Sequence, residues 1–160
     1  MVRFSRAIVA IGVAAALLVA CSSSKHNLDT SKTLTKADYI TASDDICKSY
    51  VDRITGVVSS AGAGLKLSES KDTFTKKLIP LFQAEHTELI ALKPPKKDAA
   101  NLTAALVAMN SGINTIIGRV GSAGSIADLN AINPRGLAVW KTQVGNYGMH
   151  VCGSKTTTTT

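Results

Sequence analysis

The chain has 160 residues, of which 45% are hydrophobic and only 4% are aromatic, and its formal net charge is +7 at pH 7. This length allows one domain with a single hydrophobic core. Because aromatic residues are scarce and do not alternate with a basic stripe, we do not expect the protein to bind nucleic acid.

The first 21 residues combine a basic start, an apolar stretch and a cysteine. Arg3 and Arg6 precede fourteen uncharged, mostly apolar residues, a length that suits a signal peptide and falls short of the roughly 20 residues of a transmembrane helix. Leu18-Val19-Ala20-Cys21 resembles a lipobox, in which small or aliphatic residues precede a cysteine that carries a diacylglyceryl thioether. We therefore expect cleavage of residues 1–20 and a lipid on Cys21 that holds the protein on the extracytoplasmic face of the cell membrane. A plain secretory signal and a single membrane anchor are the alternatives.

Lipidation of Cys21 leaves Cys47 and Cys152 as an even pair. Outside the cytoplasm such a pair is expected to form a disulfide. Closure of a loop of about 100 residues would stabilise the fold by roughly 4.7 kcal/mol in the chain-entropy model. Two unpaired buried thiols are the alternative. No CxxC spacing occurs, so we expect neither a zinc site nor a thioredoxin-like site.

Composition divides the rest of the chain into three parts. Residues 21–34 are rich in Ser, Thr, Lys and Asn, and we expect a flexible tether. Residues 35–153 carry helical patterns and are predicted to form the folded domain. Residues 154–160 end in a run of threonine that cannot build a core, so we expect a disordered tail.

The first predicted helix runs from Thr35 to about Val58. The Thr35 hydroxyl can cap the first turn together with Asp38, and two glycines among small residues at 59–64 end the helix. Its apolar stripe consists of Tyr39, Ile40, Ile46, Cys47, Tyr50, Val51, Ile54, Val57 and Val58.

The second predicted helix starts between Ser68 and Asp72. Pro80 interrupts it, because proline lacks an N–H and clashes with the preceding turn, so we expect either a kink or a short helix followed by a new start. Pro94 and Pro95 end the segment. The predicted inner side carries Phe74, Leu78, Leu81, Phe82, Leu89 and Leu92.

The third predicted helix has the clearest pattern, with apolar residues at alternating spacings of three and four. Gly112 and Gly118 are predicted to mark the close approach of another helix. Residues 121–130 are rich in glycine and are expected to be a loop. The stripe consists of Ala99, Leu102, Leu106, Met109, Ile113, Ile116 and Val120.

The fourth predicted helix begins at Asn133 and Pro134, which offer an N-cap and a proline in the first turn. Gly148 is its predicted end. Its stripe consists of Leu137, Trp140, Val144 and Tyr147.

Four helices joined by turns predict an all-α, up-down-up-down four-helix bundle. The fourth helix would then run antiparallel to the first. In that arrangement Cys152, a few residues beyond the fourth helix, can meet Cys47 halfway along the first helix.

Three segments stand out along the chain: LTKADYITASDDICKSY at 34–50, IPLFQAEHTELIALKPP at 79–95 and YGMHVCGS at 147–154. Together they resemble a group of small actinobacterial lipoproteins of uncharacterised function. The resemblance implies a helical, exported domain in which Cys47 and Cys152 match the group's cysteines in the first helix and in the final Tyr-Gly-x-x-x-Cys-Gly. It supplies no catalytic residues.

Titratable residues are densest at Glu85, His86 and Glu88. Neighbouring helical positions point about 100° apart, so Glu85 and His86 do not converge, whereas Glu85 and Glu88 share a face. We expect this to be a solvated helix face rather than a metal site, because no second His or Cys lies nearby.

Other candidates have equally simple explanations. His150 is expected to be a surface histidine, although it could influence the nearby Cys152 thiol. Lys93, Lys96 and Lys97 are expected to be a solvated surface that could also face anionic lipid headgroups. Met109 and Trp140 are expected to be core residues, although they could also line a cleft for an apolar ligand.

The sequence contains no catalytic motif and indicates no cofactor or metal. We therefore expect a lipid-anchored, non-enzymatic binding or adaptor module that contacts an unidentified protein of the cell envelope. A carrier of a small apolar or lipid-like ligand is the main alternative. A hydrolase is a third, and it would need a Ser or Cys within hydrogen-bond reach of His86 or His150.

Overall fold

Helices form all the regular secondary structure of residues 32–61, 64–132 and 135–153, which are the residues that the computed structural model describes. The all-α class is therefore confirmed. In chain order the elements are α1 (Lys36–Ala61), α2 (Leu67–Thr73), the π-helical segment η1 (Phe74–Leu78), α3 (Ile79–Ala91), α4 (Ala99–Ser122), α5 (Ile126–Asn130) and α6 (Arg135–Tyr147).

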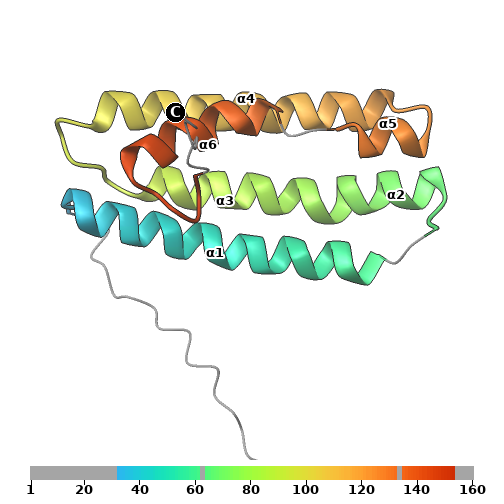
Figure 1. Ribbon diagram of the computed structural model, residues 1–160, viewed down its shortest axis with the longest axis horizontal. Coiled ribbons are helices and arrows are strands. Elements are labelled where there is room, and N and C mark those ends of the chain that lie inside the picture. The colour runs from blue at the N-terminus through green and yellow to red at the C-terminus, as the bar shows by residue number, and fades with distance from the viewer. Residues whose placement is uncertain (1–31, 62–63, 133–134, 154–160) are drawn as a thin grey trace, which may run out of the picture.

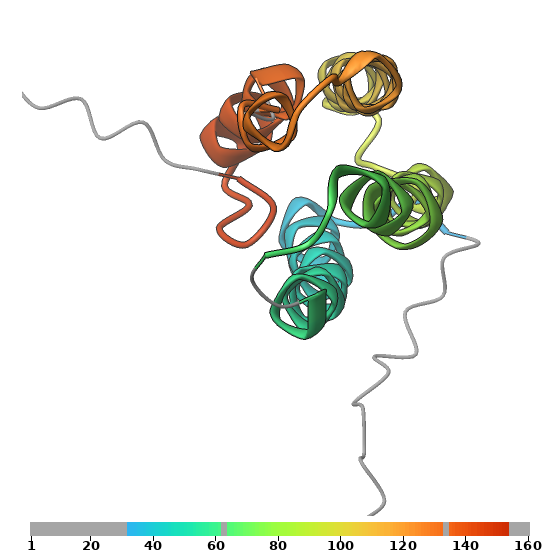
Figure 2. The ribbon, with the colours of Figure 1, turned by 90° about the vertical axis from the view of Figure 1, so that its right-hand side faces the viewer.

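Successive helical runs alternate in direction along the long axis of the molecule (Figure 1). The view along that axis shows α1, α3, α4 and α6 around a common centre (Figure 2). Helix α3 packs against both α1 and α4, and α4 packs against α6. The segment that follows α6 lies between α6 and α1 (Figure 2).

The start of α1 is capped as the sequence predicts. The Thr35 hydroxyl accepts a hydrogen bond from the Asp38 backbone N–H at 3.2 Å and donates one to Asp38 Oδ2 at 2.7 Å. The helix continues three residues beyond the predicted end, to Ala61. Its buried residues all lie between Tyr39 and Tyr50, whereas Val51 and Val58, which were predicted to be on the inner stripe, are 47% and 57% exposed.

The interruption predicted at Pro80 takes the form of a π turn between two α-helical parts. The Ile79 backbone N–H donates to the Phe74 carbonyl, five residues earlier. Pro80 follows in the first turn of α3. In a regular α-helix the Pro80 ring would clash with the Lys76 carbonyl, and the wider π turn relieves that conflict while the helix continues.

Residues 126–130 correct the prediction of a loop over 121–130, because they form α5. The Ser125 hydroxyl accepts from the Asp128 N–H at 3.1 Å, and Asp128 Oδ2 accepts from the N–H groups of Ser125 (2.8 Å) and Gly124 (2.9 Å). Interaction of the carboxylate with the Ser125 side chain, followed by its hydrogen bond from the Gly124 N–H, lowers the pKa of Asp128. Such a capping box satisfies the first turn of even a short helix.

Helix α6 ends at Gly148, as predicted. Gly148 has φ +116°, its N–H donates to the Gly145 carbonyl at 3.1 Å, and the next N–H, of Met149, donates to the Val144 carbonyl at 3.0 Å. This pair of hydrogen bonds is a Schellman motif, and its left-handed residue favours glycine. The predicted start at Asn133 and Pro134 lies outside the described residues.

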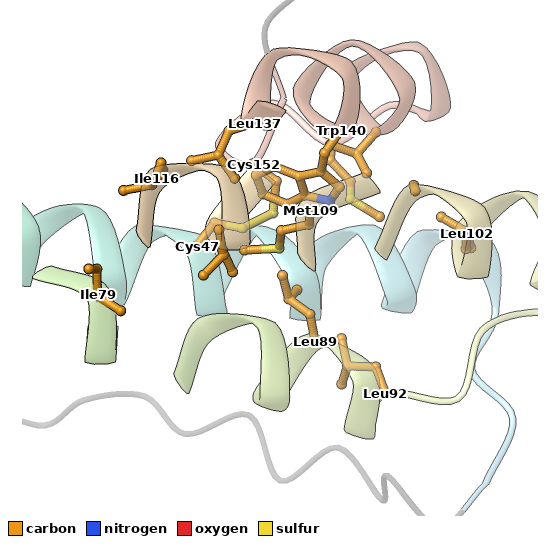
Figure 3. Packing of buried hydrophobic residues seen from close by; sticks show 14 of the residues in the cluster. Cys47, Ile79, Leu89, Leu92, Leu102, Met109, Ile116, Leu137, Trp140 and Cys152 are labelled. Atoms are coloured by element: carbon orange, nitrogen blue, oxygen red, sulfur yellow. A yellow bond between two sulfur atoms is a disulfide. The ribbon is translucent and has the colours of Figure 1, made fainter. Parts of the chain in front are cut away.

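The core is a single cluster with contributions from α1, α3, α4, α5 and α6. Five of the seven residues of the predicted α4 stripe are buried, most deeply Met109 and Ile113, each 1% exposed, while Ala99 and Leu106 are half-buried. The Cys47–Cys152 disulfide lies inside this cluster, next to Met109 and Trp140 (Figure 3). The one predicted disulfide is therefore present.

Gly153 and Gly118 differ in the space around them. A Cβ at Gly153 would lie 2.7 Å from the Met149 carbonyl oxygen and even closer to the Gly145 backbone. A Cβ at Gly118 would have no atom within 4 Å, so the predicted close helix approach there is wrong. We expect Gly153→Ala to lower the free energy of unfolding by about 2 kcal/mol through this overlap, measured by urea denaturation with the disulfide intact.

Gly118→Ala is the matched control. It adds the same methyl group to an exposed position near the end of α4, where alanine is favoured over glycine by up to about 1 kcal/mol. Equal stability of the two variants would contradict the close approach of Gly153 to Gly145.

Candidate functional site

Three consecutive backbone N–H groups near the C-terminus donate to one carboxylate of α1. Asp44 Oδ2 accepts from His150 at 2.9 Å, and Asp44 Oδ1 accepts from Val151 at 2.9 Å and Cys152 at 3.1 Å. Cys152 forms the disulfide with Cys47, and the two Cα atoms are 5.3 Å apart. Hydrogen bonds to a charged acceptor are stronger than neutral ones, so Asp44 reinforces the disulfide. Nothing in the sequence analysis indicated this role of Asp44.

A groove of about 390 Å³ lies between α3 and α4, beside the loop that joins them. Two large apolar side chains on its walls are mostly in solvent, since Ile90 on α3 is 55% exposed and Val107 on α4 is 64% exposed. The sequence patterns place both positions outside the buried stripes and gave no reason to select them. The lining consists of His86, Ile90, Leu92, Pro94, Leu102, Thr103, Leu106, Val107 and Asn110.

His86 joins the two walls of this α3–α4 groove. The ring is half-buried, and its Nε2–H donates to the Leu106 carbonyl on α4 at 3.1 Å. With the proton on Nε2, a neutral His86 ring presents Nδ1 as an acceptor. The imidazole therefore holds α3 against α4 and adds one polar group to a largely apolar lining.

A second groove, of about 410 Å³, lies between α4 and α6. The polar side chains of Asn101, Gln143 and Asn146 take part in its lining. Desolvating amides without replacing their hydrogen bonds is unfavourable. The α3–α4 groove is therefore the better site for an apolar group.

Among the described residues, buried side chains pack the space between the helices. An enclosed space that Trp140 and Leu106 help to line has a volume of about 10 Å³, which is about the room that one water molecule needs. Trp140 and Met109 are 3% and 1% exposed, so the prediction that they are core residues is confirmed. An apolar ligand that binds to the described part of the chain would therefore lie in a surface groove.

Glu85 corrects the prediction of a solvated helix face, because it is only 6% exposed. It lies four residues from both Leu81 and Leu89, which are buried on the same side of α3. Burial raises the pKa of Glu85 to about 7, while the positive charge of Lys141 on α6 opposes this shift and the negative charge of Glu88 adds to it. The effect of Glu88 agrees with the predicted shared face.

Glu88 also links α3 to α1. The hydroxyl of the buried Tyr50 donates to Glu88 Oε1 at 2.6 Å, and the Arg53 guanidinium lies 4.7 Å from the centroid of the Tyr50 ring. Burial, followed by the hydrogen bond to Glu88, raises the pKa of the Tyr50 hydroxyl. This group is therefore a polar contact that orients α1 on α3.

A hydrolase would need a Ser or Cys beside the ring of His86 or His150. Within the described ranges, no Ser or Cys side chain hydrogen-bonds to the ring of His86 or His150, and no cluster of three or more His, Cys, Asp or Glu residues could hold a metal ion. His150 is exposed. Cys21, residues 1–20 and the tail at 154–160 lie outside the described residues, as does most of the predicted tether; Leu34, its last residue, is buried.

No family model matches the chain, and no curated protein or solved structure does. None of the helices in the described part of the chain is both long enough and apolar enough to span a bilayer.

The raised pKa of Glu85 predicts how stability changes with pH. The folded protein binds this proton more tightly than the unfolded chain, so its contribution is complete below about pH 4.5 and is lost as the pH rises through 7. Glu85→Gln stays neutral at every pH. We expect it to raise the free energy of unfolding by about 3 kcal/mol at pH 8 and to change it little at pH 4, measured by urea denaturation at both values.

Asp45→Asn serves as the control, because it removes one exposed carboxylate from α1. Its effect should be small at both values of pH. A Glu85→Gln variant less stable than the parent at pH 8 would contradict the assignment of a destabilising buried charge.

Proposed function

We propose that this chain is a lipid-anchored, extracytoplasmic lipoprotein whose mature part is a non-enzymatic binding or adaptor module of the cell envelope. In this proposal residues 1–20 are a cleaved lipoprotein signal, and the described helices are the body of an up-down-up-down four-helix bundle. The lipobox supports the anchor. The Cys47–Cys152 disulfide supports an oxidising compartment and leaves Cys21 as the one remaining thiol.

The α3–α4 groove is the observation that carries the binding role. Monomeric proteins cover most large apolar side chains, and an exposed apolar patch commonly marks an interaction site. Here Ile90 and Val107 stand in solvent on opposite walls, while Leu102 is buried between them. Because His86 holds the walls together, the groove is formed before anything binds.

An apolar segment of an envelope protein suits this groove best. The groove is partly open to solvent, so a helix or an extended peptide could lie in it with apolar side chains between Ile90 and Val107. A small apolar or lipid-like ligand is the second candidate, because about 390 Å³ falls within the usual range for small-molecule pockets. Both candidates use the same residues, and one experiment can separate them.

The anchor is tested by replacing the cysteine of the lipobox. We expect the parent protein to enter the detergent phase when membranes are dissolved and phase-separated, because two or three acyl chains anchor stably. Cys21→Ala should remain in the aqueous phase. Unchanged partitioning of Cys21→Ala into detergent would refute lipidation.

The groove is tested by placing a photo-crosslinking amino acid at position 107 in intact cells. We expect one discrete protein adduct, which disappears when Ile90→Lys introduces a charge on the facing wall. The same probe at Val139, which is 55% exposed on α6, should give no such adduct. Crosslinking that is equal at both positions, or that persists with Ile90→Lys, would contradict the adaptor role. A co-purifying small molecule seen by native mass spectrometry, and lost in Ile90→Lys, would favour the carrier.

A further inference from the structure

Two lysines occupy the tip of the loop between α3 and α4. The Asp98 N–H donates to the Pro95 carbonyl at 2.9 Å, which closes a turn with Lys96 and Lys97 at its two central positions. Pro95 is buried, whereas both lysines are exposed. The turn therefore places two positive charges at one end of the molecule.

Contacts from two other helices hold this Pro95–Asp98 turn. The hydroxyl of Tyr147, at the end of α6, donates to Asp98 Oδ2 at 2.8 Å. Above the Tyr147 ring lies Lys36 of α1, with its Nζ 4.4 Å from the ring centroid. Three exposed cationic side chains, those of Lys36, Lys96 and Lys97, thus belong to one fixed surface, the lysine surface.

The acidic residue next to Lys96 and Lys97, Asp98, does not form an ion pair with either of them. Within the described ranges, neither residue takes part in an ion pair, in contrast to Lys48 with Asp52 (3.0 Å) and Lys76 with Asp72 (2.6 Å). The Asp98 carboxylate instead accepts from a phenol. The lysine surface is therefore available to an external anion.

The chain enters the domain beside this surface. Leu34 is 7% exposed, and its N–H donates to the Lys93 carbonyl at 2.9 Å, next to the turn. Cys21 precedes Leu34 by thirteen residues, which can span at most about 45 Å. The opposite end of the domain is farther away by the length of α1, about 39 Å for 26 residues. An anchor at Cys21 thus favours approach of the lysine surface to the bilayer.

We infer that the lysine surface docks on an anionic lipid bilayer. This inference rests on the proposed lipid anchor, which would keep the surface close to the membrane. Each basic side chain at an anionic bilayer surface raises the binding constant about fivefold. Three lysines would attach an untethered domain only weakly to the bilayer. On a tethered domain the local lipid concentration is high, so the same three lysines determine how the domain is oriented.

The test attaches the complete mature chain, residues 21–160, to vesicles through the Cys21 thiol and a maleimide lipid. The disulfide occupies the other two cysteines, so the attachment does not depend on lipidation in cells. A water-soluble acylating reagent then labels the lysines, and mass spectrometry gives the rate at each site. Lys76 and Lys77, exposed on η1, are the internal control.

On vesicles with 30% phosphatidylglycerol we expect labelling of Lys96 and Lys97 to be at least about threefold slower than on pure phosphatidylcholine vesicles. Lys76 and Lys77 should label equally on both. High salt should abolish the protection because it screens the charges. In the double variant Lys96→Gln and Lys97→Gln, labelling of Lys36 should return to its rate on phosphatidylcholine.

Equal protection of both lysine pairs would overturn the inference, because attraction would then come from total charge. Protection in native membranes that is absent on lipid vesicles would overturn it in favour of an acidic protein partner. Because the anchor is supplied chemically, neither outcome affects the Cys21→Ala partitioning test. A failure of that test would likewise leave the labelling result interpretable.

Discussion

The attachment of the C-terminal segment to α1 is the interaction on which the rest of the structure depends. Helix α6 packs on α4, and α1 packs on α3, so the segment after α6 must complete the remaining side. It does so through the Cys47–Cys152 disulfide and three hydrogen bonds to Asp44. The disulfide restricts the unfolded chain, since it closes a loop of 105 residues. The carboxylate fixes the backbone of the same segment in the folded state.

The sequence predicted the parts of the fold that depend on long periodic patterns. Most of the α4 stripe, the Thr35 cap and the pairing of Cys47 with Cys152 are confirmed because many residues, or a simple count of cysteines, supported each prediction. Shorter signals were missed. Helix α5 depends on one capping box of four residues, at Ser125 to Asp128, within a glycine-rich segment.

Glu85 and the α3–α4 groove show why the site was harder to predict than the fold. The position of Glu85, four residues from both Leu81 and Leu89, indicated burial, but its charge argued for solvent, and position decided the outcome. The groove has no signal of its own in the sequence. Exposed apolar residues such as Ile90 and Val107 become a site only when two helices bring them to facing walls, and spacing within one helix does not show this.

The long-range contacts of α1 and of Asp98 determine when the fold can be completed during synthesis. Among the described helices α1 is synthesised first, yet its Asp44 and Cys47 bind residues 150–152, and the two cysteines are 105 residues apart in the sequence. The hydrogen bond to Asp98 likewise forms only after Tyr147, 49 residues later, has been added. Contacts between such distant residues form slowly compared with local ones. These contacts of α1 therefore form only after synthesis has passed residue 152.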